Sequence, residues 1–300
     1  MRRGPSPARR GHPAAIVDAS PEPAALAQGP PCPEEVTVPA LVPGVEIHRS
    51  RARSRDRGGW LDSQHSFSFG RYQDPMNTHF GRLLVNNDDH IAPGTGFDTH
   101  GHRDMEIVTW VLSGSLVHQD SEGHSGVIYP GLAQRMSAGS GILHSERNDG
   151  WRDGSLRADT PAEPVHLVQM WVVPDTTGEQ PGYEQMEIDP RELENHLVVV
   201  AGGLPTHEDR AAIRIRNRTS ALHAARLTPG RTVELPDAPF LHLYVPLGSV
   251  TLEGEGALDT GDAARLTATG GRRVTAGAQG AEILVWEMHA GMTMLDVRGH

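Results

Sequence analysis

Short runs of β-forming residues, each closed by a turn sequence, constrain the fold of this chain most strongly. In the first half these runs cover residues 81–86, 106–112, 115–118 and 165–173. Asparagine, aspartate, proline and glycine separate them, as in Pro93-Gly94 and Pro130-Gly131. Many short strands at this spacing are typical of sandwiches and barrels. The sequence therefore predicts an all-β protein with few short helices.

The second half repeats this rhythm. Its β-like runs cover residues 197–201, 213–216, 221–227, 240–246, 248–252 and 283–288, and residues 190–195 predict one short helical turn. Internal sequence similarity is weak, so the repeat is inferred from the spacing of the runs. The pattern predicts two tandem barrels, with the first in residues 39–175, a linker in 176–190 and the second in 191–300.

Composition limits the remaining possibilities. Residues 1–38 are rich in proline, alanine and arginine, and this segment is predicted to be a disordered tail. Cys32 is the only cysteine, which excludes an internal disulfide and a thiolate metal cluster. All 27 basic residues are arginines, so lysine Schiff-base chemistry is excluded. No apolar stretch approaches the ~18 residues of a membrane span or forms a signal-peptide core, which predicts a cytoplasmic protein.

Charge argues against nucleic acid as a partner. The formal net charge is -11, and negative charge repels the phosphate backbone. One basic stretch stands out, because five arginines alternate with other residues between Arg49 and Arg57. We interpret this stretch as a solvated edge strand or loop rather than as an anion-binding surface, because charged edges also resist aggregation.

Two motifs each place a pair of metal-ligand side chains two residues apart. The first is His100-Gly101-His102 and the second is His144-Ser145-Glu146. Side chains at i and i+2 of a strand point to the same face, so each motif can direct two ligands into one cavity. Three imidazoles and a carboxylate suit a first-row transition metal better than calcium. The motifs therefore predict one mononuclear metal centre in the first barrel.

The two motifs lie within longer stretches that resemble a known family. GTGFDTHGHRDMEIVTWVLSG (94–114) and GLAQRMSAGSGILHSERN (131–148) are similar to the two cupin motifs, except that Ser137 replaces the usual proline. Together with GWLDSQHSFSFGRYQDP (59–75), they resemble the pirin family of bicupins across about residues 45–175. The resemblance implies a bicupin with two jelly-roll-type barrels.

Pirin-like proteins hold their metal with the two motifs, which implies His100, His102, His144 and Glu146 as ligands here. Glu106 remains an alternative ligand, because it follows His102 by four residues and ordinary cupins use a glutamate there. The resemblance prefers Glu146 and leaves Glu106 to orient an imidazole. Other histidines, such as His118 and His166, lack such partners and are interpreted as surface or structural residues. The same holds for His242 and His289, so no second metal site is expected in the second barrel.

The resemblance also implies quercetin 2,3-dioxygenase activity, in which O2 opens a flavonol ring and carbon monoxide is released. The expected metal is Fe(II), with nickel, copper, manganese or zinc as alternatives. Glu146 is then both ligand and candidate base for the flavonol hydroxyl. Met136 and Trp110 are candidates for the pocket wall, although core packing is the preferred interpretation for both. The protein is expected to act as a monomer on a small molecule.

A regulatory function is the alternative. Some pirin-like proteins resemble transcriptional co-regulators in which the oxidation state of the iron changes a surface that a protein partner recognises. The Arg49–Arg57 stretch would then contribute to docking, although the chain carries no nucleic-acid-binding motif. A metal-binding bicupin without catalysis is a third possibility, but a metal with open coordination positions argues against a purely structural site.

Overall fold

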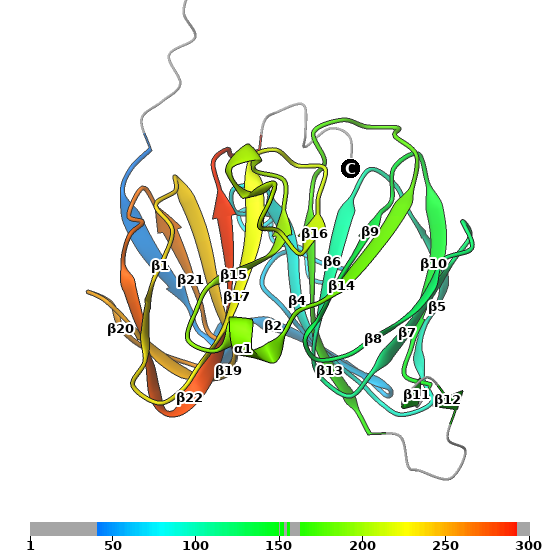
Figure 1. Cartoon of the computed structure of the whole chain (residues 1–300), viewed down its shortest axis with the longest axis horizontal. Helices are drawn as coiled ribbons and strands as arrows, with labels where there is room; N and C mark the ends of the chain where they lie inside the picture. The colour runs from blue at the N-terminus through cyan, green and yellow to red at the C-terminus, as the bar shows by residue number, and fades with distance from the viewer. Residues whose placement is uncertain (1–40, 150, 153–154, 157–162, 293–300) are drawn as a thin grey trace, which may run out of the picture. The chain divides into compact units, whose positions relative to one another are not determined.

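The computed structural model describes residues 41–149, 151–152, 155–156 and 163–292. The predicted disordered tail and Cys32 lie outside these residues. The described chain is almost entirely β and forms two barrels, which confirms the predicted all-β bicupin (Figure 1). No helix in this part of the chain has the length and apolar character that a membrane span requires.

The first barrel is built from two main sheets. The larger sheet contains, in spatial order, β14 (Gly182–Glu187), β9 (Leu132–Ser137), β6 (Glu106–Ser113), β13 (Val165–Val172), β4 (Leu83–Ile91), β3 (Leu61–His65) and β2 (Ser54–Gly58). The smaller sheet contains β5 (Gly96–His102), β10 (Ile142–Arg147), β7 (Leu116–Asp120) and β8 (Ser125–Ile128). Strands β11 (Trp151–Arg152) and β12 (Ser155–Leu156) pair antiparallel in a separate two-stranded sheet.

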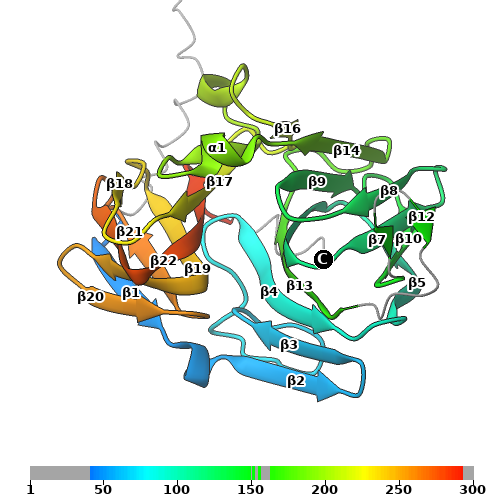
Figure 2. The same cartoon turned by 60° about the horizontal axis from the view of Figure 1, so that its bottom comes forward.

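The second barrel is formed by one sheet. Its spatial order is β1 (Gly44–His48), β21 (Ala263–Thr267), β19 (Phe240–Leu252), β22 (Arg273–Met288), β17 (Ser220–Leu227), β15 (Val198–Gly202) and β16 (Ile213–Arg214), while β18 (Thr232–Glu234) pairs with β22 and β20 (Gly256–Asp259) with β19 (Figure 2). The helical segments are η1 (Ser50–Ala52), α1 (Pro190–Leu193) and η2 (Pro205–His207). The helix α1 matches the predicted turn and is capped by Asp189, which accepts a hydrogen bond from the Arg191 amide at 2.9 Å.

Two strands cross the predicted domain boundaries. Strand β1 falls in the predicted first barrel, but it pairs with β21 of the second. Strand β14 falls in the predicted linker, but it pairs with β9 of the first barrel. Each strand completes the backbone hydrogen bonding of a strand distant in sequence, and local patterns carry no information about such pairing.

The central strands of the first barrel are buried on both faces. On β6 and β13, Val108, Trp110, Val168 and Met170 face the second barrel and pack in one core with Tyr244 and Trp286. The alternate residues Val111 and Leu167 face the barrel interior. Trp110 therefore lies between the barrels, where its Nε1 donates to Glu282 Oε1 at 2.7 Å, and it does not line the first barrel. Met136 packs inside that barrel with Met105 and Ile107.

Several arginines of the Arg49–Arg57 stretch have partners within the protein, while Arg51, Arg55 and Arg57 are exposed. Strand β2 lies at the edge of the larger sheet, as the preferred interpretation expects. Arg49 forms an ion pair with Asp262 at 2.6 Å, and Arg55 pairs with Asp62. Arg53 donates to the Tyr244 hydroxyl at 2.8 Å. The turn η1 interrupts the stretch, so its arginines do not form one extended basic face.

A buried hydrogen-bond network connects the two barrels. Asp88 on β4 accepts from the Tyr244 hydroxyl on β19, and its other oxygen lies 2.8 Å from His166 Nε2. Burial alone raises the pKa of Asp88, but hydrogen bonds with His166 and Tyr244 and the charge of Arg53 outweigh it. The pKa is therefore lowered, and Asp88 stays ionised at neutral pH.

We expect Tyr244→Phe to lower the free energy of unfolding by about 2 kcal/mol at pH 7. The substitution removes a charge-assisted hydrogen bond and leaves a buried carboxylate oxygen without its donor. Urea denaturation measures the change. Tyr129→Phe is the matched control, because Tyr129 is 37% exposed. Equal stability of the two variants would contradict the importance of this network.

Candidate metal centre

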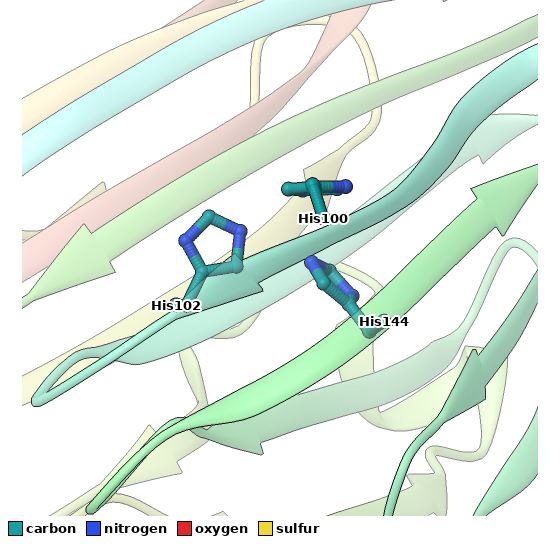
Figure 3. Close-up of side chains that lie close together, drawn as sticks. All are labelled: His100, His102 and His144. Atoms are coloured by element: carbon teal, nitrogen blue, oxygen red, sulfur yellow. The ribbon is translucent and has the colours of Figure 1, made fainter.

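The two predicted motifs lie on neighbouring antiparallel strands. His100 and His102 are on β5, and His144 and Glu146 are on β10. The register places His144 opposite His100 and Ile142 opposite His102. Figure 3 shows that the rings of His100, His102 and His144 project from the same side of the two strands. Pairing of β5 with β10 thus brings together residues more than forty positions apart.

The three imidazoles converge closely. Their candidate ligand nitrogens all lie within 4.8 Å of one another. The ring centroids are separated by 4.5 Å between His100 and His144, 4.8 Å between His100 and His102, and 4.9 Å between His102 and His144. Three imidazoles on one side of a sheet suit a divalent transition metal.

The protonation states favour metal binding. Burial, together with the neighbouring His100 and His118 rings, lowers the pKa of His144 to about 3. Burial and the neighbouring His144 and His100 lower the pKa of His102 to about 4. Both rings are therefore neutral at pH 7 and offer a nitrogen lone pair.

The tautomer of His100 follows from its hydrogen bond. Its Nδ1 lies 2.8 Å from the carbonyl oxygen of Asp98. Because a carbonyl can only accept, Nδ1 carries the proton and Nε2 keeps its lone pair. This backbone contact is the kind that orients metal-bound histidines.

His144 supplies an independent test of whether a metal fits. Only 2% of its surface is exposed, and both ring nitrogens are buried without a hydrogen-bond partner. An unpaired buried polar group costs about 1–3 kcal/mol, so native structures rarely leave one. A divalent ion held with His100 and His102 would satisfy one of these nitrogens. The residues present therefore fit a metal ion.

Glu146 lies beside His144 and His118, but it does not join the close group that His100, His102 and His144 form. Its candidate ligand oxygen lies within 4.8 Å of the ligand atoms of His144 and His118. The Trp171 indole donates to Gln169 Oε1 at 3.1 Å, and Gln169 Nε2 donates to Glu146 Oε2 at 2.8 Å. An indole only donates and a carboxylate only accepts, so the orientation of the Gln169 amide is defined. The Trp171 ring also contacts His102, at 4.8 Å between centroids.

Glu106 faces away from the histidines. Residues 103–105 turn the chain between β5 and β6, and Asp104 has a positive φ of 50°. Glu106 therefore shares a face with Trp110, and its Oε2 accepts from the Arg216 amide at 3.0 Å. Burial raises its pKa. The prediction that Glu106 orients an imidazole is wrong, because the chain does not continue straight beyond His102.

Sequence reasoning missed His118. Strand β7 pairs with β10 and places His118 opposite Glu146 and Asp120 opposite His144. His118 is fully buried, its Nε2 lies 3.3 Å from Asp120 Oδ2, and its ring stacks on Tyr183 at 4.7 Å between centroids. The signal available in the sequence was the i, i+2 spacing of His118 and Asp120, which repeats the spacing of the ligand motifs.

Comparison with known proteins identifies relatives that cover more than half of this chain. The family model of pirin matches residues 46–172. A Mycobacterium tuberculosis protein is 57% identical over 246 residues, which are 82% of this chain and 96% of the relative, and its name assigns it provisionally as a quercetin 2,3-dioxygenase. An Escherichia coli protein named quercetin 2,3-dioxygenase is 39% identical over 175 residues, which are 57% of this chain and 71% of the relative.

A solved structure resembles this one over a similar extent. The bacterial pirin YhhW from Escherichia coli, in complex with nickel(II), is 30% identical, with a TM-score of 0.70 over 82% of this chain and 100% of that one. Shared sequence, shared fold and the two histidine motifs agree, and we conclude that the chain belongs to the pirin family.

Proposed function

We propose that this protein is a metal-dependent dioxygenase that opens the ring of a flavonol-like substrate with O2, as a quercetin 2,3-dioxygenase does. The observation that carries the proposal is the convergence of His100, His102 and His144 beside a carboxylate that Gln169 holds in place. The names of the Mycobacterium tuberculosis and Escherichia coli relatives support this reaction class.

In this proposal His100, His102, His144 and Glu146 hold one metal ion. Fe(II) is the proposed native metal, because a mixed imidazole and carboxylate set accepts this redox-active ion. Nickel, copper, manganese and zinc are alternatives with the same donor preferences. The nickel(II) complex of the related YhhW supports a divalent first-row ion.

The metal, when bound, supplies open positions at which O2 and a substrate oxygen meet. The chain's own groups prepare the substrate. Glu146 accepts the proton of the flavonol hydroxyl, while Gln169 holds Oε2 and so fixes the direction of the carboxylate. Trp171 fixes Gln169 in turn. The proposed reaction consumes one O2, opens the central ring and releases carbon monoxide.

The regulatory alternative receives less support. The Arg49–Arg57 stretch is the feature that would contribute to docking in that alternative. Arg49, Arg53 and Arg55 bind Asp262, Tyr244 and Asp62, so these three side chains have partners within the protein.

Loss of a central imidazole is expected to remove the metal. After anaerobic reconstitution with Fe(II) and desalting, His144→Ala should contain about one ion per chain less than the wild-type protein, because the site loses a ligand that both strands position. His196→Ala is the control, since His196 is exposed and its Nδ1 contacts the Glu194 carbonyl oxygen. Elemental analysis gives the metal content. Equal content in both variants would remove His144 from the ligand set.

Metal-replete protein is expected to consume quercetin and O2 and to release carbon monoxide. Glu146→Gln should abolish turnover, because the amide cannot accept the hydroxyl proton and binds metal weakly. Oxygen uptake and carbon monoxide release measure the reaction. If reconstitution with every proposed metal leaves quercetin unchanged, the substrate assignment fails even though the metal site stands.

Removal of the support for Glu146 is expected to have a smaller effect. Gln169→Leu should lower kcat/KM for quercetin by about 10- to 100-fold, which is typical when a partner of a metal ligand is lost. Gln73→Leu is the matched control, because Gln73 is exposed and donates only to the Gly70 carbonyl oxygen. An unchanged kcat/KM in Gln169→Leu would show that this hydrogen bond does not position the carboxylate.

A further inference from the structure

A second histidine–carboxylate cluster lies in the second barrel. The carboxylate of Glu287, near the end of β22, contacts histidine side chains from three segments. Its Oε2 is 2.9 Å from His207 Nε2 and 2.7 Å from His223 Nε2, and its Oε1 is 2.9 Å from His289 Nε2. His207 comes from η2 and His223 from β17. No second metal site is predicted here from the sequence, because Glu287-Met288-His289 contains a single histidine; His207 and His223 lie far from it along the chain.

The cluster faces the interior of the second barrel. Glu287 shares a face of β22 with Val285 and Ile283, and His223 shares a face of β17 with Ala225; these three apolar residues belong to the barrel core. His207, His223 and Glu287 are each 9% exposed or less. Protein interiors rarely contain three such groups unless they bind one another or an ion.

We propose that His207, His223 and Glu287 form a second divalent-metal site. Their candidate ligand atoms all lie within 4.8 Å of one another, as do those of the first centre. Two ligand atoms that each lie about 2.1 Å from an ion at a right angle are about 3 Å apart, close to the separations of 2.9 and 2.7 Å observed here. Two histidines and a glutamate are the donor set of open zinc sites.

His289 should raise the metal affinity of this site, whereas Arg210 should lower it. His289 Nε2 donates to the second oxygen of Glu287, which orients the carboxylate in the way that partners of metal ligands commonly do. Arg210 Nη2 lies 2.9 Å from His207 Nδ1. A guanidinium only donates, so this contact keeps the His207 proton on Nε2, where the ion would bind.

Metal binding therefore requires Arg210 to release His207. The Thr206 carbonyl oxygen lies 3.2 Å from the same Arg210 nitrogen and offers it another acceptor. The His207 proton then moves to Nδ1, and Nε2 becomes a ligand. The Nε2 proton of His223 likewise gives way to the ion, by transfer to Nδ1. Arg210 thus lowers the metal affinity, and its removal should raise it.

The test measures Co²⁺ binding in the His100→Ala/His144→Ala double variant, which lacks the first centre. Calorimetry and the visible absorption of bound Co²⁺ should show one ion per chain. Adding Glu287→Gln or His207→Gln should abolish this binding, while adding Arg210→Gln should tighten it about 10-fold or more. Adding His196→Ala should leave it unchanged. Circular dichroism verifies that each variant folds.

Wild-type protein provides a second measurement that does not depend on the double variant. It should bind two Co²⁺ ions per chain, and His207→Gln should bind one. A wild-type stoichiometry of one that His207→Gln leaves unchanged would overturn the proposal, as would Co²⁺ binding in the double variant that His207→Gln leaves intact. In either case the cluster would be a hydrogen-bonded network only. A wild-type stoichiometry of one that His207→Gln reduces to zero would instead count against the first centre.

Discussion

Burial of β6 and β13 on both faces is the constraint on which the rest of the structure depends. One face of these strands packs against the second barrel through Trp110, Val168 and Met170, in a core that also contains Trp286. The opposite face lines the first barrel, and there Gln169 supports Glu146. Because a one-residue slip would exchange the two faces, packing between the barrels also determines which side chains reach the metal centre.

The two histidine clusters differ in how their polar atoms are satisfied. In the first barrel both nitrogens of His144 are buried without partners, and the proposed ion completes the site. In the second cluster each of His207, His223 and His289 already contacts Glu287, and Arg210 holds His207 in the opposing tautomer. The first cluster therefore offers unpaired ring nitrogens to an ion. In the second cluster an ion can bind only after the Nε2 protons of His207 and His223 have moved. The proposed first site is therefore expected to bind its ion more tightly than the proposed second site.

Glu146 and Glu106 show which side-chain positions the local sequence pattern can predict and which it cannot. Glu146 was predicted on the same face as His144, and the regular pairing of β10 with β7 gives it that position. Glu106 would lie on the same face as His102 if the strand continued straight. The turn at residues 103–105 moves it into another sheet, where it binds Arg216. His118 and His207 were missed for a related reason, since their partners are contributed by other strands.

The sequence by itself determined the all-β class, the two barrels and the three histidines of the candidate centre, because alternation within a strand and turn residues between strands are local properties. Only the tertiary structure decided that β1 joins the second barrel, that β14 joins the first, and that His207, His223 and Glu287 meet. Strand order and register depend on packing between segments far apart in the chain, and no short stretch of sequence encodes that packing.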